Sequence, residues 1–161
     1  MSWNKAQLVQ QWRLQLQERL AGLQRGRDSA RAGTRVDGGH RPENRGERAS
    51  VTSQGYLAHG LAQRIAELQQ ALALLDEMGA GSRSRVSVGA LVHLMDEQGQ
   101  ASWLAVFPGG DASLLEQGEQ RLRVLSATSP WARPLAGLEA GDSAELSHGG
   151  SALEVEVLEV L

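Results

Sequence analysis

Arginine side chains are concentrated in one stretch of the chain, between residues 25 and 48. This stretch holds seven arginines and four acidic residues, a local charge of about +3, whereas the whole chain carries −3. A guanidinium group forms paired hydrogen bonds to phosphate and carboxylate oxygens. The cluster therefore predicts contact with RNA, a nucleotide or an acidic protein wall, with a solvated polar loop as the simpler alternative.

Several other chemistries are excluded by the composition. The chain has no cysteine, which removes disulfides, thiolate metal sites and cysteine nucleophiles and fits a reducing cytosol. Its four histidines match no metal-ligand spacing, and no nucleophile elbow, phosphate-binding loop or dinucleotide-binding glycine motif occurs. The N-terminal residues lack the apolar core of a signal peptide, and no apolar run approaches about 18 residues. We therefore expect a cytoplasmic protein without a membrane segment.

Two amphipathic helices are predicted on either side of the arginine-rich stretch. Residues 4–24, continuing to about residue 32, place one apolar stripe at spacings of three and four: Val9, Trp12, Leu16, Leu20 and Leu23. Residues 52–78, capped by Ser50 or Thr52, carry a matching stripe, partly at coiled-coil spacing: Leu57, Leu61, Ile65, Leu68, Leu72 and Leu75. The stripes bury each other most simply in an antiparallel hairpin roughly 40 Å long.

The pattern changes to that of a small β-rich domain after the second helix. Glycine and serine residues predict a linker over 80–85, and the hairpin then occupies residues 1–79, with its tip at about 33–51. Beyond the linker, alternating apolar residues predict strands over 86–88, 90–95, 103–107, 121–125, 143–146 and 153–160, with a short helix over 131–135. The expected fold class is α+β, with the second domain over residues 86–161.

A specific order of turns and strands follows in the second half of the chain. It consists of Arg123-Val-Leu-Ser-Ala-Thr-Ser-Pro130, Trp131-Ala-Arg-Pro-Leu-Ala-Gly137, Leu138-Glu-Ala-Gly-Asp142 and His148-Gly-Gly150. In the first half, Glu43-Asn44 is followed eleven residues after the glutamate by Gln54-Gly55-Tyr56. Together these features resemble a divergent branch of the bacterial Gre transcript-cleavage factors. The resemblance implies an FKBP-like fold for the second domain.

The resemblance also implies a partner, bacterial RNA polymerase. In this family the globular domain docks at the rim of the secondary channel, and the hairpin reaches toward the active centre and the nascent RNA. The family's polymerase-binding loop corresponds to Thr128, Ser129 and Pro130, although its leading residue is commonly Asp rather than Thr. The residues expected to set the electrostatics of the tip are Arg35, His40, Arg41, Asn44, Arg45 and Arg48.

The tip departs from the family at its metal ligands. In Gre factors an Asp and a Glu three residues apart help hold a Mg²⁺ ion shared with the polymerase. Glu43 matches the Glu, but His40 replaces the Asp, and a neutral imidazole is a poor ligand for Mg²⁺. Asp37 and Glu47 are further carboxylates at other spacings. We therefore expect a monomeric accessory factor with no cofactor of its own, which modulates transcription without stimulating efficient cleavage.

Two other functions fit parts of the sequence. The arginine-rich tip could bind RNA or an acidic protein without any polymerase. The FKBP-like domain could be a prolyl isomerase, whose pocket would have to draw on Trp103, Phe107 and Trp131. A fold alone does not confer a function.

Overall fold

The computed structural model describes residues 2–34 and 45–161. The chain divides into two compact units, one formed by Met1–Arg13 with Ala71–Leu161 and the other by Leu14–Gln70. Two long helices are followed by a six-stranded sheet, which confirms the predicted α+β class. The domain boundaries at residues 79 and 86 stay a prediction.

Helix α1 spans Lys5–Thr34 and is capped by the residue before it. The side-chain oxygen Oδ1 of Asn4 accepts a hydrogen bond from the backbone N–H of Gln7 at 3.1 Å, as a helix N-cap does. The polar residues after residue 24 do not interrupt the helix. The helix therefore continues past residue 24, as predicted, and ends at Thr34, two residues beyond the predicted limit of about residue 32.

Helix α2 spans Arg45–Met78 and begins earlier than the sequence predicted. The predicted start at residue 52 was wrong, because Ser50 and Thr52 lie inside the helix instead of capping it. The preceding arginines, glutamate and alanine have high helix propensity and extend the helix toward its N-terminus. The helix ends where expected, at Met78, and Gly79 follows it with a φ of +68°, which suits a glycine after the last turn.

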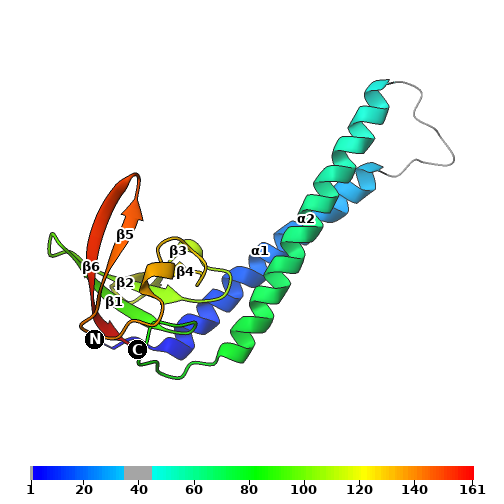
Figure 1. Ribbon diagram of the computed structural model, residues 1–161. Helices are drawn as coiled ribbons and strands as arrows, with labels where there is room; N and C mark the ends of the chain where they lie inside the picture. Colours follow the sequence, from blue (N-terminus) through cyan, green and yellow to red (C-terminus); the bar gives the residue numbers. More distant parts are fainter. Residues whose placement is uncertain (1, 35–44) are drawn as a thin grey trace. The chain divides into compact units, whose positions relative to one another are not determined.

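Within the unit Leu14–Gln70, α1 and α2 run side by side in opposite directions (Figure 1). The side chains buried there are Leu16, Ala30, Ala58 and Ile65. Gly26 faces Leu61 closely, since a Cβ on Gly26 would lie 3.5 Å from Cδ1 of that leucine. Leu57 was predicted on the buried stripe but is 55% exposed. Its neighbour Ala58 takes the buried position instead.

The second half of the chain forms one mixed sheet. Its strands are β1 Leu91–Asp96, β2 Ala101–Val106, β3 Asp111–Gln117, β4 Gln120–Leu125, β5 Ser143–His148 and β6 Ser151–Val160. Their order is β3-β4-β2-β1-β6-β5, with β2 and β4 parallel and all other neighbours antiparallel. A 3-10 helix, η2, spans Arg133–Leu135 within the segment predicted to be helical.

One strand prediction was wrong, and one strand was missed. Residues 86–88 form a bend and a turn instead of a strand. Val86 still pairs with a distant segment, since its N–H donates to the carbonyl of Leu138 at 2.9 Å and its carbonyl accepts from Gly137 at 2.8 Å. Strand β3 was not predicted. Its pairing with β4 shifts register between Asp111 and Leu114, which interrupts the alternation that marks a strand in sequence.

The sheet carries apolar side chains on both faces. One face forms a buried cluster with the segment after β4, and it includes Val92, Leu94, Leu104, Val106, Leu125, Leu135, Leu146, Val155 and Val157. On the other face His93 stacks on Trp103 with ring centroids 4.4 Å apart, and Trp3 meets Trp103 edge-on at 5.8 Å. The chain just before α1 therefore packs on the second face.

Candidate functional site

The loop after β4 holds the three residues predicted to bind polymerase. Ser129 organises this loop: its N–H donates to the carbonyl of Ser126 at 3.1 Å, and its Oγ accepts from the N–H of Ala132 at 3.1 Å. Thr128 and Pro130 are exposed. The structure thus assigns Ser129 a role in shaping the turn and leaves Thr128 and Pro130 at the surface. Their contact with polymerase stays a prediction.

A tight backbone approach sets the start of β3 against the end of β4. A Cβ on Gly110 would lie 2.1 Å from the carbonyl carbon of Leu125, so no larger residue fits there. Two residues later Ala112 has a φ of +69°, which is unusual for a residue with a side chain. Both features accompany the register shift of β3. They bring the carbonyl of Ala112 within reach of β4.

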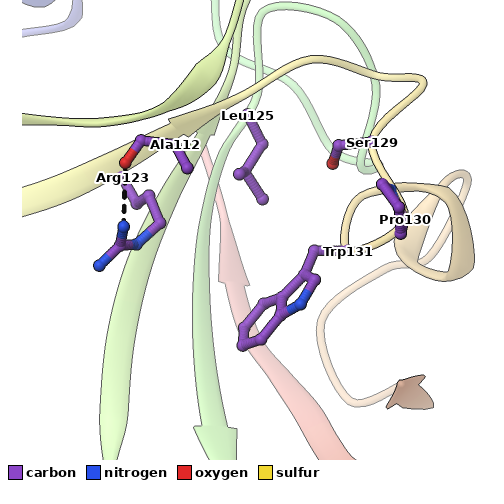
Figure 2. A pocket seen from close by; sticks show the side chains of 6 residues that line it. All are labelled: Ala112, Arg123, Leu125, Ser129, Pro130 and Trp131. Carbon is purple, nitrogen blue, oxygen red and sulfur yellow. Dashed lines mark hydrogen bonds between the residues drawn. The ribbon is translucent and has the colours of Figure 1, made fainter. Parts of the chain in front are cut away.

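A pocket of about 440 Å³ lies between this bulge and the loop after β4. We call it the Arg123 pocket, and its lining consists of Ala112, Arg123, Leu125, Ser129, Pro130 and Trp131. Figure 2 shows Arg123 on one side and Ser129 and Pro130 on the other, with Leu125 and Trp131 between them. Nη1 of Arg123 donates to the carbonyl oxygen of Ala112 at 2.9 Å. The sequence did not single out Arg123, because the bulge that completes the pocket was not predicted.

The predicted tip residues cannot be placed in the same way. Arg35, Asp37, His40, Arg41, Glu43 and Asn44 lie outside the described residues. Arg45, Glu47 and Arg48 fall in the first turns of α2, of which the backbone alone is described. The role of Glu43 in holding Mg²⁺ and the electrostatic role of the tip therefore stay predictions.

Within residues 2–34 and 45–161, no group of three or more His, Asp or Glu side chains could hold a metal ion. Over the same ranges no helix is long and apolar enough to cross a bilayer. The aromatic residues considered for an isomerase pocket are dispersed. Trp131 lines the Arg123 pocket, whereas Trp103 stacks on His93 and Phe107 is fully buried.

A pair of cations near the first turn of α1 was missed by the sequence reasoning. Lys5, the only lysine of the chain, is buried, and its Nζ donates to the carbonyls of Gly81 at 2.8 Å and Leu161 at 2.9 Å. Arg83 donates to Gly81 as well, at 3.0 Å, and to the carbonyl of Met78 at the end of α2, also at 3.0 Å. Burial and, to a lesser extent, the charge of Arg83 lower the pKa of Lys5 to about 8. The sequence signal that could have drawn attention to Lys5 is that it is the only lysine in an arginine-rich chain.

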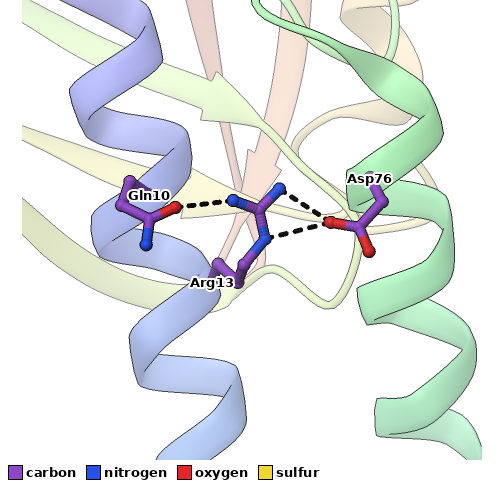
Figure 3. Close-up of polar contacts among 3 residues, drawn as sticks. All are labelled: Gln10, Arg13 and Asp76. Atoms are coloured by element: carbon purple, nitrogen blue, oxygen red, sulfur yellow. Dashed lines mark hydrogen bonds and ion pairs between the residues drawn. The ribbon is translucent and has the colours of Figure 1, made fainter.

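Two further contacts fix the start of α1. The indole N–H of Trp12 donates to the carbonyl of Pro108 at 2.8 Å, and its side chain is fully buried. Arg13 reaches α2 through Asp76, with Nη2 and Nε lying 2.7 and 3.0 Å from the same carboxylate oxygen (Figure 3). Gln10 accepts a third bond from Arg13 at 2.6 Å. Residues 5–13 are thus joined to the β domain and to the end of α2.

No family model matches the chain. It is 33% identical over 99 residues to transcription elongation factor GreA of Magnetococcus marinus, which covers 60% of each chain. It is 34% identical over 100 residues to GreA of Hyphomonas neptunium, covering 61% of this chain and 60% of the relative. The chain is therefore similar to Gre-type factors over 60% of its length. The match spans 60% of the length of these curated relatives.

Two solved structures are also similar to the chain over nearly its whole length. GreA factor homolog 1 of Thermus thermophilus is 16% identical, covers 96% of this chain and 93% of its own, and gives a TM-score of 0.39. Gfh1 of Thermus aquaticus is 18% identical, with 97% and 93% covered and a TM-score of 0.41. At these scores the description of the fold rests on the helices and strands of the chain itself.

Proposed function

We propose that this chain binds bacterial RNA polymerase and modulates transcription elongation or initiation from the secondary channel. The observation that carries the proposal is the identity to curated GreA proteins in a chain that also has paired helices and a β domain. The globular part would dock outside the channel through the loop after β4. The helical pair would enter the channel.

The described elements are compatible with that arrangement. The part of α2 within the unit Leu14–Gln70 provides roughly 40 Å of helix at 1.5 Å rise per residue. It exposes Tyr56 and Leu57, and α1 contributes Arg25 and Arg31 at its surface. Exposed aromatic and arginine side chains are common at protein interfaces. The loop after β4 offers Thr128 and Pro130 for the outer contact.

Retention on polymerase tests the proposal directly. Purified tagged chain is mixed with bacterial RNA polymerase and recovered through the tag, and we expect the polymerase subunits to be recovered with it. Thr128→Arg should reduce recovery, because it places a bulky charge in the loop. Gln98→Arg, at another exposed turn, is the matched control and should not. If wild-type protein recovers no polymerase, the proposed function is wrong.

Cleavage is a separate part of the proposal, because the tip carries Glu43 without its Asp partner. We propose that the factor modulates the enzyme without efficient stimulation of RNA cleavage. Two carboxylates are needed to position a second Mg²⁺ beside the first. Backtracked elongation complexes with Mg²⁺ should therefore show little added RNA shortening, and His40→Asp should increase it. Strong shortening by the wild type that Glu43→Ala abolishes would contradict this part alone.

A further inference from the structure

The Arg123 pocket has an apolar interior and one charged group. Arg123 is the single charged residue among the six that line it, and no acidic residue lines it. A volume of about 440 Å³ lies in the range of pockets that enclose small ligands or side chains. The lining therefore favours an apolar group that carries a negative charge beside it.

The guanidinium group of Arg123 is held in place and keeps donors to spare. Among the described residues, its one side-chain hydrogen bond is the 2.9 Å contact from Nη1 to the carbonyl of Ala112. A guanidinium has five N–H donors, and a carboxylate accepts two of them side by side. The bond to Ala112 orients the group before a ligand arrives, which lowers the entropy lost on binding.

Apolar surface continues from the pocket onto β3. Leu114 is the cross-strand partner of Arg123 and is 45% exposed. Pro130 is exposed at the opposite side of the pocket (Figure 2). Arg123 thus lies between two apolar contacts. Such a surface suits a protein segment better than a nucleic-acid backbone, which requires several cations in a row.

We propose that the Arg123 pocket binds an apolar side chain of a partner protein while Arg123 pairs with a carboxylate next to it on the same segment. The partner segment then has Leu, Ile, Met or Phe beside Asp or Glu. That the partner is RNA polymerase rests on the proposed function. The chemistry of the pocket is tested without polymerase.

Three capped hexapeptides with Leu-Glu, Leu-Gln or Ser-Glu at the centre are the probes. Each is titrated into the ¹⁵N-labelled full chain, and the indole N–H signal of Trp131 reports on the pocket. The Leu-Glu peptide should bind about two- to fivefold more tightly than the Leu-Gln peptide, which is the range of an exposed ion pair. It should also bind more tightly than the Ser-Glu peptide, which lacks the apolar side chain. Equal affinities for the three peptides would overturn the proposal, and shifts spread over the whole surface would do so as well.

Two arginines of the same strand provide a matched pair of variants. Arg121 and Arg123 are both exposed on β4, but Arg121 lies opposite Glu116 and does not line the pocket. Arg123→Gln should reduce the affinity for Leu-Glu to that for Leu-Gln, and Arg121→Gln should leave it unchanged. Leu114→Ser should weaken both leucine peptides. Urea unfolding of each variant checks that the fold is retained. Equal losses in Arg121→Gln and Arg123→Gln would indicate a general charge effect and contradict the proposal.

Recovery of polymerase by the same variants separates the two hypotheses. If the proposed function and the pocket proposal are both correct, Arg123→Gln should recover about two- to fivefold less polymerase than Arg121→Gln. If the peptides bind as expected but wild-type protein recovers no polymerase, the proposed function is wrong and the pocket chemistry stands. If polymerase is recovered equally by both variants and the peptides do not discriminate, the pocket proposal is wrong. Sedimentation that shows a dimer lost in Arg123→Gln would identify a second copy as the occupant, which also contradicts it.

Discussion

The first turns of helix α1 and the unit Leu14–Gln70 differ in the side chains that they bury. The first turns of α1, which lie in the unit with the sheet, bury Lys5, Leu8, Val9 and Trp12. In the unit Leu14–Gln70 the buried side chains include two alanines, Ala30 and Ala58, and large apolar side chains are exposed on α2. Stability is therefore expected to depend on the first turns of α1. The unit Leu14–Gln70 leaves more of its side chains at the surface for a partner.

Removal of Trp12 should produce the largest effect. Trp12→Ala deletes a fully buried indole and leaves the carbonyl of Pro108 without its donor. The free energy of unfolding should fall by about 3–5 kcal/mol, as for other buried aromatic truncations. Leu14→Ala, two residues along α1 and half exposed, is the control and should lose less than about 1 kcal/mol. Urea unfolding followed by far-UV circular dichroism measures both. A loss near 1 kcal/mol for Trp12→Ala would contradict the contrast between the first turns of α1 and the unit Leu14–Gln70.

The pH dependence of stability should reveal Lys5. Burial and then the charge of Arg83 lower the pKa of Lys5 from 10.5 to about 8. Between these values the unfolded chain binds more protons than the folded one, so the free energy of unfolding rises as pH rises. We expect a gain of about 1–2 kcal/mol between pH 7.5 and 9.5 from this group. Because the chain has no other lysine, Lys5→Met should remove most of that gain. An equal gain in Lys5→Met would show that another group causes it.

The strongly periodic parts of the fold could be predicted from the sequence. The helical stripes and the last alternating strand were recognised because their buried residues recur with the period of a helix or a strand. The predicted burial of Leu57 was wrong, because the period of the helix places Ala58 inward instead. The start of α2 was misplaced because Ser50 and Thr52 are good caps in isolation. Local preference could not show that the helix continues through them.

The candidate site was less predictable, because it depends on contacts between distant residues. The resemblance placed Thr128 and Pro130 in a loop, and both residues are exposed there. Arg123, by contrast, reaches the pocket because a register shift in β3 and the small size of Gly110 bring Ala112 beside it. Neither the bulge nor the pairing of Val86 with residues 137 and 138 has a local sequence pattern.

The ion pair between α1 and α2 should contribute less than Trp12 or Lys5. Arg13 and Asp76 are partly exposed, so water and salt screen their attraction (Figure 3). A double-mutant cycle with Arg13→Ala and Asp76→Ala should give a coupling of about 0.5–1 kcal/mol that decreases in high salt. The more exposed pair Arg85 and Glu139 is the control and should give a smaller coupling. A coupling near zero for Arg13 and Asp76, or a larger one for the control pair, would contradict this expectation.

Substitution of exposed apolar residues on α2 should have the smallest effect on stability. These substitutions therefore test a role in transcription separately from a role in folding. Tyr56 is 76% exposed in the unit Leu14–Gln70, and Leu74 is 47% exposed in the unit with the sheet. Replacing either with serine should change the free energy of unfolding by no more than about 0.5 kcal/mol, because little apolar contact is lost. If the helical pair enters the polymerase channel, Tyr56→Ser should weaken the effect on transcription in vitro while Leu74→Ser does not. Loss of the transcription effect in both variants, or in neither, would contradict a special role for the surface of the unit Leu14–Gln70.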